Sequence, residues 1–249
     1  MINAGFLVAL LLLAVPASGA GGPPVLVTVG EVTDTSAVVW VRGQSWGKVT
    51  VRYGVADRPE EKRGEVNVSP GAHLTGKLPL VNLAPASRYR YTVSQGAAEV
   101  QGEFVTAPAP GMAAPVRFAW SGDLGSRTQC RHLTDGYPIF RALARFRADF
   151  FIFAGDTIYA DHACAGPDRV PGYDFVSRKL PDFWAKHRYN REDPGVQEYF
   201  RTLSVYAIWD DHEVRNDFSG PSDVLMPVGR RAFVDYFPIS PPADDPGRL

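Results

Sequence analysis

Three stretches of the sequence end an apolar run in acidic residues. They are GDLG at 122–125, GDTIYAD at 155–161 and AIWDDHEVRND at 207–217. Carboxylates gathered at one place repel one another, and each is costly to desolvate unless a cation is present. Hard divalent or trivalent ions bind carboxylate, phenolate and imidazole groups, and two such ions can clamp a phosphoryl group. The residue types therefore predict a metal site.

Two ordinary explanations compete with a metal site. The charged stretch at 207–217 is also typical of a solvated helix face, and a single aspartate after a strand often caps the next helix. The residues before Asp210, from Val205 to Trp209, have no polar face, which favours a buried strand. Three such motifs in succession, one of them joined to a histidine, favour metal ligands over caps.

Strands and helices must alternate to position these motifs. The apolar runs within 116–125, 149–161 and 204–217 predict strands, and residues 181–203 predict helix, with Asp193 as an N-cap and Pro194 in the first turn. Near-continuous apolar strands separated by helices predict a parallel sheet covered on both faces. Asp123, Asp156 and Asp211 then lie at the carboxyl ends of the strands, where functional groups gather. Four apolar residues between the first two strands share one predicted helical face: Ile139, Phe140, Leu143 and Phe146.

Residues 24–106 show a different pattern. Short runs alternate apolar and polar residues between Gly, Pro, Asn and Asp, which predicts an all-β sandwich. The segment 80–93, with Tyr89 and Tyr91, resembles the tyrosine-corner region of fibronectin type III domains, and this implies that one tyrosine pins a loop. Residues 107–115 are rich in Pro and Ala and predict a linker to a second domain at 116–249. We expect the sandwich to serve as a spacer or to position substrate.

The N-terminus predicts a signal peptide over residues 1–20. The apolar run from Phe6 to Val15 is too short to span a bilayer comfortably, and Ser18 and Ala20 stand at the spacing that export peptidases accept. We therefore expect an exported protein, periplasmic or secreted. Residues 2–15 contain no Lys or Arg, so an uncleaved anchor stays the alternative. No later stretch is apolar enough to cross a membrane.

Net charge argues against nucleic acid as a partner, and the cysteine content predicts a disulfide. The 249 residues carry 26 basic and 27 acidic side chains, and a net charge of −1 gives no electrostatic footprint for nucleic acid. Export allows the only two cysteines, Cys130 and Cys164, to form a disulfide. Two unrelated buried thiols are the alternative.

At GDLG, GDTIYAD and WDDHEVRND the chain resembles the PhoD-like alkaline phosphatases, a branch of the calcineurin-like metallophosphoesterases. The resemblance runs from about residue 24 onward. It implies a fibronectin type III-like β-sandwich followed by an α/β metallophosphoesterase domain. It also implies an exported, metal-dependent phosphoric-ester hydrolase, an alkaline phosphatase or phosphodiesterase, in which a metal-bound hydroxide attacks the phosphate ester.

The resemblance assigns roles by motif. His212 takes the position of the histidine that contacts the phosphate and helps to protonate the leaving group. The implied site is dinuclear or multinuclear and holds iron with calcium, with manganese and zinc as alternatives. The implied metal ligands are Asp123, Asp156, Tyr159, Asp211 and Asn216.

The chain also departs from the family pattern. DLG replaces D-x-H in the first motif, and Asp211 stands where the superfamily has Asn. No histidine follows His212, so the later motifs, including a G-H-x-H-like pair, are missing. We therefore expect a fragment with an incomplete α/β domain. The alternative function is a catalytically inactive remnant that acts at most as an extracellular β-sandwich binding or spacer module.

The four remaining histidines lack a motif of their own. His132 and His162 lie close in sequence to the two cysteines and to the acidic motifs, so they either face the site or belong to its loops. We expect His73 and His187, which are far from any motif, to lie on the surface.

Overall fold

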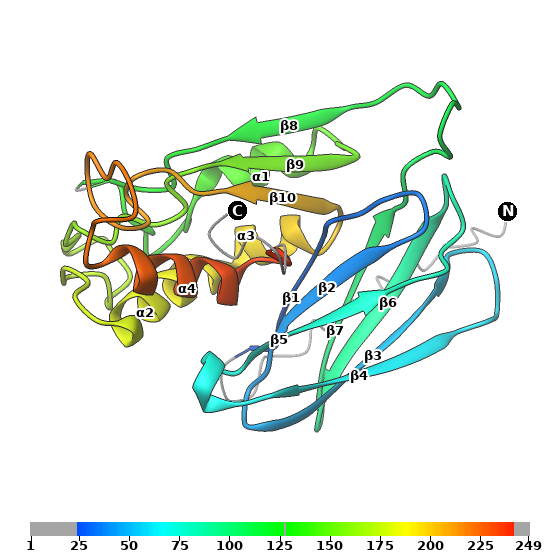
Figure 1. Cartoon of the computed structure of the whole chain (residues 1–249), viewed down its shortest axis with the longest axis horizontal. Coiled ribbons are helices and arrows are strands. Elements are labelled where there is room, and N and C mark those ends of the chain that lie inside the picture. The colour runs from blue at the N-terminus through cyan, green and yellow to red at the C-terminus, as the bar shows by residue number, and fades with distance from the viewer. Residues whose placement is uncertain (1–23, 127, 242–249) are drawn as a thin grey trace, which may run out of the picture.

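The described residues form two β-sheets and four α-helices (Figure 1). The structure is a computed structural model that describes residues 24–126 and 128–241. The predicted signal peptide at 1–20 lies outside these residues. The six-stranded sheet has the order β5 (Thr75–Leu80), β2 (Ala37–Arg42), β1 (Leu26–Gly30), β10 (Ser204–Ile208), β9 (Phe150–Ala154), β8 (Phe118–Ser121). The four-stranded sheet has the order β4 (Lys62–Val68), β3 (Gly47–Val55), β6 (Arg88–Gln95), β7 (Ala98–Val105).

The first seven strands form a sandwich. Strands β1, β2 and β5 pair antiparallel in one layer, and β3, β4, β6 and β7 pair antiparallel in the other. Alternate residues of both layers meet in a valine-rich core that also contains Tyr89, Tyr91 and Phe104. The hydroxyl of Tyr89 accepts a hydrogen bond from Ala84 N at 2.8 Å. This is the tyrosine that pins a loop.

Strands β1 and β2 belong to two cores at once. Val27 and Val29 face the sandwich, whereas Leu26 lies in the core beneath the helices together with Trp40 of β2. Both strands are therefore buried along their whole length. The indole Nε1 of Trp40 donates to Asp235 O of the last helix at 2.7 Å, which ties that helix to the sheet.

The six-stranded sheet continues from the sandwich into the α/β part. β1 pairs parallel with β10 at Val29 and Ser204, and β10, β9 and β8 pair parallel with one another. Because one sheet runs through both parts, the division into separate domains at 107–115 stays a prediction.

The helices lie between and after the parallel strands. They are α1 (Pro138–Ala144), α2 (Leu180–Arg191), α3 (Pro194–Phe200) and α4 (Met226–Tyr236), and a short 3₁₀ helix, η1, spans Pro70–Ala72. The predicted cap of α3 is confirmed, because the Asp193 carboxylate accepts from Gly195 N and Val196 N. The predicted helical face near 140 is partly wrong. Helix α1 ends at Ala144, Phe140 alone of its apolar residues is buried, and Ile139 and Phe146 are exposed.

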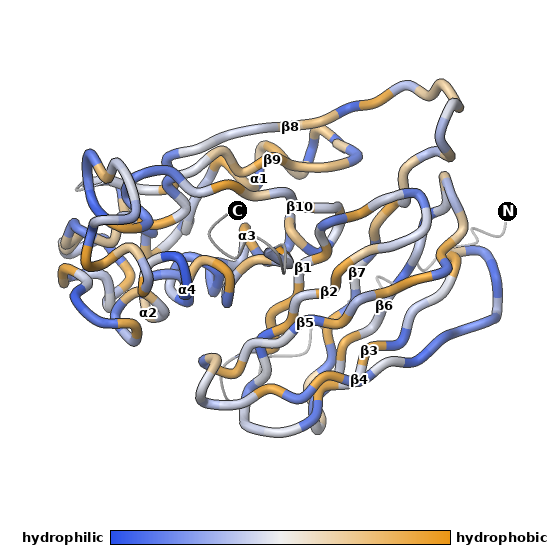
Figure 2. The backbone as a smooth tube through the Cα atoms, viewed as in Figure 1, coloured by the Kyte–Doolittle hydropathy of each residue, from blue (hydrophilic) through white to orange (hydrophobic). Residues whose placement is uncertain are grey.

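The parallel strands are covered on one face only. Phe151, Phe153 and Val205 pack into the core that α2, α3 and α4 complete. On the opposite face, Trp120 is 69% exposed and Ile208 is 52% exposed. The prediction of a sheet buried on both faces is therefore wrong for the described residues, because the helices all pack on the same side. Figure 2 shows that β9 is hydrophobic.

Two histidines expected at the surface lie inside the protein. His187 is 1% exposed and stacks on Tyr236 at 5.3 Å between ring centroids. His73 is half-buried, stacks on Trp184 at 5.3 Å and shares a 2.7 Å hydrogen bond with the Tyr236 hydroxyl. The prediction that these histidines lie on the surface is wrong, because α2, α4 and the η1 region pack together around them. Among the described residues, no helix is both long enough and apolar enough to cross a membrane.

Candidate active site

Acidic residues follow the carboxyl ends of the three parallel strands. Asp123 comes two residues after β8, Asp156 two residues after β9, and Asp211 three residues after β10. Asp123 and Asp156 have positive φ angles of 56° and 51°, a conformation that non-glycine residues rarely adopt and that is common at functional sites. Parallel pairing of the strands brings these residues to the same edge of the sheet.

The main chain holds the acidic loops close together. Asp123 N donates to Gly155 O at 3.3 Å, and Leu124 N donates to Asp156 O at 2.9 Å. A Cβ atom on Gly155 would lie 2.5 Å from Asp210 Cβ, so only glycine permits this approach. Gly155 is thus required for the loop after β9 to pack against the loop after β10.

Tyr159 joins the first two motifs. Its hydroxyl donates to Asp123 Oδ1 at 3.0 Å, and its N–H donates to the Tyr173 hydroxyl at 2.8 Å. Its ring lies 4.2 Å from the His212 ring and 5.7 Å from the His162 ring, measured between centroids. The phenol is therefore held beside the carboxylates, as its proposed role as a ligand requires.

His212 is held by an acid that the motif analysis did not assign. Its ring Nδ1 lies 2.7 Å from Asp161 Oδ1. Its main-chain N–H donates to Asp156 Oδ1 at 3.3 Å. The other oxygen of Asp161 accepts from Asn216 N at 2.9 Å. Asp161 thus orients the imidazole and leaves Nε2 free for contacts elsewhere. Asp161 is the last residue of the GDTIYAD motif, so its place in that motif was the sequence signal that could have identified it.

Glu213 is the second residue that the motif analysis did not assign. It is fully buried, and Oε2 accepts from Asp156 N at 3.2 Å and from Asp210 N at 2.8 Å. Oε1 accepts from both the N–H and the hydroxyl of Thr157, at 2.5 and 2.6 Å. One carboxylate therefore joins the loop after β9 to the loop after β10. A fully buried acid beside the motif histidine could not be recognised from sequence, where Glu213 resembles one more solvated charge.

Burial and neighbouring charges shift the protonation of the site. Burial raises the pKa of Asp156 to about 6, and the Asp123 carboxylate adds to this, while His212 and Tyr159 oppose it. Burial also raises the pKa of Glu213 to about 7. Burial alone would lower the pKa of His212, but the hydrogen bond and charge of Asp161 raise it overall. A cation at the site would favour the ionised form of these carboxylates.

The donor set fits a hard metal ion. Ligand atoms of Asp156, Asp211 and His212 lie within 4.8 Å of one another. Asp123 and Tyr159 add a carboxylate and a phenol that are already in contact. Carboxylate and phenolate oxygens with one imidazole suit iron, calcium or manganese, and zinc also accepts this set.

Asn216 is the remaining residue predicted as a ligand. Its side chain is exposed, and its amide donates to Asp217 Oδ2 at 2.5 Å. Its contact with the site runs through its main-chain N–H, which holds Asp161. Its role as a metal ligand stays a prediction.

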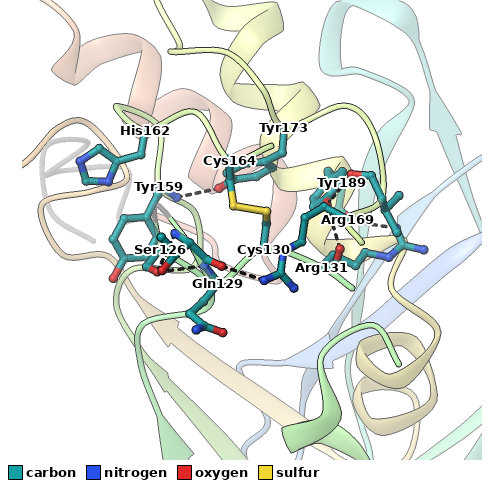
Figure 3. The surroundings of a disulfide bond; sticks show 12 residues. Ser126, Gln129, Cys130, Arg131, Tyr159, His162, Cys164, Arg169, Tyr173 and Tyr189 are labelled. Atoms are coloured by element: carbon teal, nitrogen blue, oxygen red, sulfur yellow. Dashed lines mark hydrogen bonds between the residues drawn. A yellow bond between two sulfur atoms is a disulfide. The ribbon is translucent and has the colours of Figure 1, made fainter. Parts of the chain in front are cut away.

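A disulfide supports the loops beside the site (Figure 3). Cys130 and Cys164, the pair indicated by the sequence, are joined with a Cα–Cα distance of 6.0 Å. Both are buried, and they pack with Tyr159 and Tyr173. A cavity of about 360 Å³ adjoins the site, and Asp123, Cys130, His132 and Arg169 are among its lining residues. The bond therefore links the wall of this cavity to the loop that carries Tyr159.

The carboxyl edge of the parallel sheet thus carries acids, a phenol and a histidine, a set of side chains that can hold metal ions. Residues 118–249 match the description of the family called PhoD-like phosphatase, and the chain belongs to this family. None of the curated proteins matches the chain.

One solved structure shows the same fold over most of this chain. The chain is similar to a protein described as "Structure of PhoD", with a TM-score of 0.74 and 18% identity over 90% of this chain. It spans 48% of the length of that protein. Part of the chain also matches the fn3 domain of the human collagen alpha-1(XX) chain, with 23% identity over 40% of this chain and 96% of that one, at a TM-score of 0.28. A redesigned β-sandwich protein matches at a TM-score of 0.30, with 22% identity over 36% of this chain and 93% of that one.

Proposed function

We propose that the protein is an exported, metal-dependent hydrolase of phosphoric esters. The observation that carries this proposal is the convergence of Asp123, Asp156, Tyr159 and Asp211 with His212 at one edge of the sheet, in a chain of the PhoD-like family. Membership of the family favours a phosphate ester as substrate.

Four side chains are proposed to hold the metal ions: Asp123, Asp156, Tyr159 and Asp211. When bound, such ions neutralise charge on the phosphoryl oxygens and favour formation of the nucleophile. Iron with calcium is our preferred combination, because phenolate suits a ferric ion and carboxylate oxygens suit calcium. Without metal ions, the three carboxylates would also repel the negatively charged phosphate ester.

His212 is proposed to act on the leaving group. Its Nδ1 is fixed by Asp161 at 2.7 Å, so Nε2 is the nitrogen that can reach substrate. Asp161 favours the protonated imidazole, which can donate a proton to the departing alkoxide oxygen. Glu213 keeps the loops of Asp156 and Asp211 at a fixed separation while this happens.

Hydrolysis of p-nitrophenyl phosphate and of bis(p-nitrophenyl) phosphate tests the activity. The full chain, freed of metal and then supplied with iron, calcium, manganese or zinc, is expected to release p-nitrophenol only with metal. Asp156→Ala is expected to abolish release. Asp149→Asn is the matched control, because Asp149 immediately precedes β9 whereas Asp156 follows it. Activity that survives Asp156→Ala, or that needs no metal, would contradict the proposal. Absence of hydrolysis by the wild type with every metal would also contradict it and would support the catalytically inactive remnant.

Export is proposed on two grounds. The apolar run from Phe6 to Val15 has the length of a signal-peptide core, with Ser18 and Ala20 after it at the spacing of a cleavage site, and a disulfide is most stable outside the cytoplasm. Cell fractionation and mass spectrometry of the mature N-terminus test this. We expect recovery outside the cytoplasm with an N-terminus near residue 21, whereas a cytoplasmic, uncut chain would be inconsistent with export.

A further inference from the structure

A second group of possible metal ligands includes His212 together with Asp161 and His162. His162 Nε2 is 3.7 Å from Asp161 Oδ2, and His212 Nδ1 is 2.7 Å from Asp161 Oδ1. Ligand atoms of the three residues lie within 4.8 Å of one another. Two imidazoles and one carboxylate therefore converge in a group that shares only His212 with the group of Asp156, Asp211 and His212.

We propose that Asp161, His162 and His212 form an inhibitory site for a borderline divalent ion, of which Zn²⁺ is the type. Zinc is bound by three protein ligands and water in many proteins, and bonds of about 2.0–2.1 Å place tetrahedral ligand atoms roughly 3.4 Å apart. The present separations of 2.7 and 3.7 Å lie on either side of that value. Two nitrogen ligands favour zinc, copper or nickel over calcium and magnesium.

The surroundings hold these ligands in place. The His162 ring stacks near that of Tyr159, as Figure 3 shows, and the His162 and His212 ring centroids are 5.0 Å apart. The Lys186 ammonium, fully buried beneath the loop, donates to His162 O. Burial lowers the pKa of Lys186 to about 7, so its side chain offsets at most one of the negative charges that Asp161, Asp156 and Asp211 place beside His212. The local charge thus favours a cation.

Metal binding here would remove His212 from catalysis. The ion would take the Nδ1 electron pair and displace the proton that Asp161 and His212 share, and that proton would pass to solvent. With the ion on Nδ1, the ring could not form the imidazolium that donates a proton from Nε2 to the leaving group. Inhibition rests on the proposed hydrolase function, whereas zinc binding does not.

Zinc titration of the full chain tests both parts. Isothermal titration calorimetry is expected to show a tight zinc site, and excess zinc is expected to inhibit hydrolysis by the enzyme loaded with iron and calcium. His162→Gln is expected to weaken zinc binding and inhibition by about tenfold or more, the size of loss that even an outer-shell partner can cause. His132→Gln, in the neighbouring disulfide loop, is the matched control and is expected to match the wild type.

X-ray absorption at the zinc edge provides a measurement that needs no variant. With one equivalent of zinc, two imidazole ligands are expected, because the group of Asp156, Asp211 and His212 contains only one. A single imidazole, or an unchanged zinc affinity in His162→Gln, would overturn the proposal. Absence of ester hydrolysis by the wild type would refute the proposed function alone, since calorimetry and absorption would still decide the zinc site.

Discussion

Asp161 Oδ1 lies 2.7 Å from His212 Nδ1, and this contact joins the loop after β9 to the loop after β10. Carboxylate and imidazole are separated by 51 positions in sequence. A carboxylate at this distance fixes the orientation of the ring and favours its protonated form. The contact therefore determines which nitrogen of His212 is available to substrate.

Replacing either residue of this pair should slow hydrolysis. We expect His212→Ala to lower kcat by about 10²- to 10⁴-fold, the usual contribution of a positioned proton donor. Asp161→Asn should cause a smaller loss and move the alkaline limb of the kcat profile to lower pH, because Asp161 raises the pKa of His212. Steady-state kinetics between pH 5 and 9 measure both effects. Unchanged kcat and profile in Asp161→Asn would contradict this role.

Glu213 should control metal affinity through two loops. Glu213→Gln replaces one accepting oxygen with a donor, so two of the four hydrogen bonds at this side chain are lost. We expect metal affinity to fall by roughly 10- to 100-fold, as for other residues that support ligands. Amide exchange at Asp156 and Asp210 should rise even without metal.

Asp193→Asn is the matched control for Glu213→Gln. Asp193 is also fully buried and also accepts from main-chain N–H groups, but it caps α3 away from the ligands. Its variant should lower thermal stability and leave metal affinity unchanged. Equal losses of metal affinity in both variants would show that Glu213 acts only through general stability.

Acid should destabilise the protein through His187. Burial lowers the pKa of His187 to about 3, and the Arg191 charge adds to this. Between pH 6.5 and about 3 the unfolded chain binds a proton that the folded protein excludes, so this contribution to stability falls as pH falls. From pH 7 to 5 the loss is about 2 kcal/mol. Urea unfolding at the two pH values measures it.

The variant His187→Phe isolates this effect. Phenylalanine keeps the aromatic contact with Tyr236 and cannot titrate, so the pH dependence should become weaker by the amount just given. Val49→Ala, in the sandwich core, should lower stability equally at both pH values. A pH dependence in His187→Phe equal to that of the wild type would refute the assignment.

Reduction of the disulfide should cost stability. The bond between Cys130 and Cys164 closes a sequence separation of 34 residues, for which chain entropy gives about 3 to 4 kcal/mol. The double variant with both cysteines changed to Ser should unfold at lower urea concentration by that free energy. Dithiothreitol should shift the wild type to the same extent and leave the variant unchanged. A shift of the variant by dithiothreitol would show that the reductant acts elsewhere.

Local signals predicted much of the fold. Asp193 followed by Pro194 is a complete helix start within a few residues, and the structure has it. The apolar runs before Asp123, Asp156 and Asp211 predicted the three parallel strands, because a short run of consecutive apolar residues favours a strand. The tyrosine corner was likewise predictable from a short segment.

Contacts between distant segments were not predictable. Asp161 and Glu213 act through partners more than 50 positions away, so their sequence context alone does not separate them from surface charges. Phe146 continues a helical pattern that the chain leaves at Ala144. Both faces of the parallel strands carry apolar side chains, so the sequence did not indicate which face the helices cover.

Two tryptophans test the finding that, among the described residues, strands β8, β9 and β10 are covered on one face only. Trp40 is fully buried and bonded to Asp235 O, so Trp40→Ala should lower the free energy of unfolding by about 3–5 kcal/mol. Trp120 lies in the same sheet with 69% of its surface exposed, so Trp120→Ala should change that free energy by no more than about 0.5 kcal/mol. Urea unfolding of both variants decides the matter. A large loss in Trp120→Ala would mean that this face is covered in solution, since truncating a solvated side chain removes little packing.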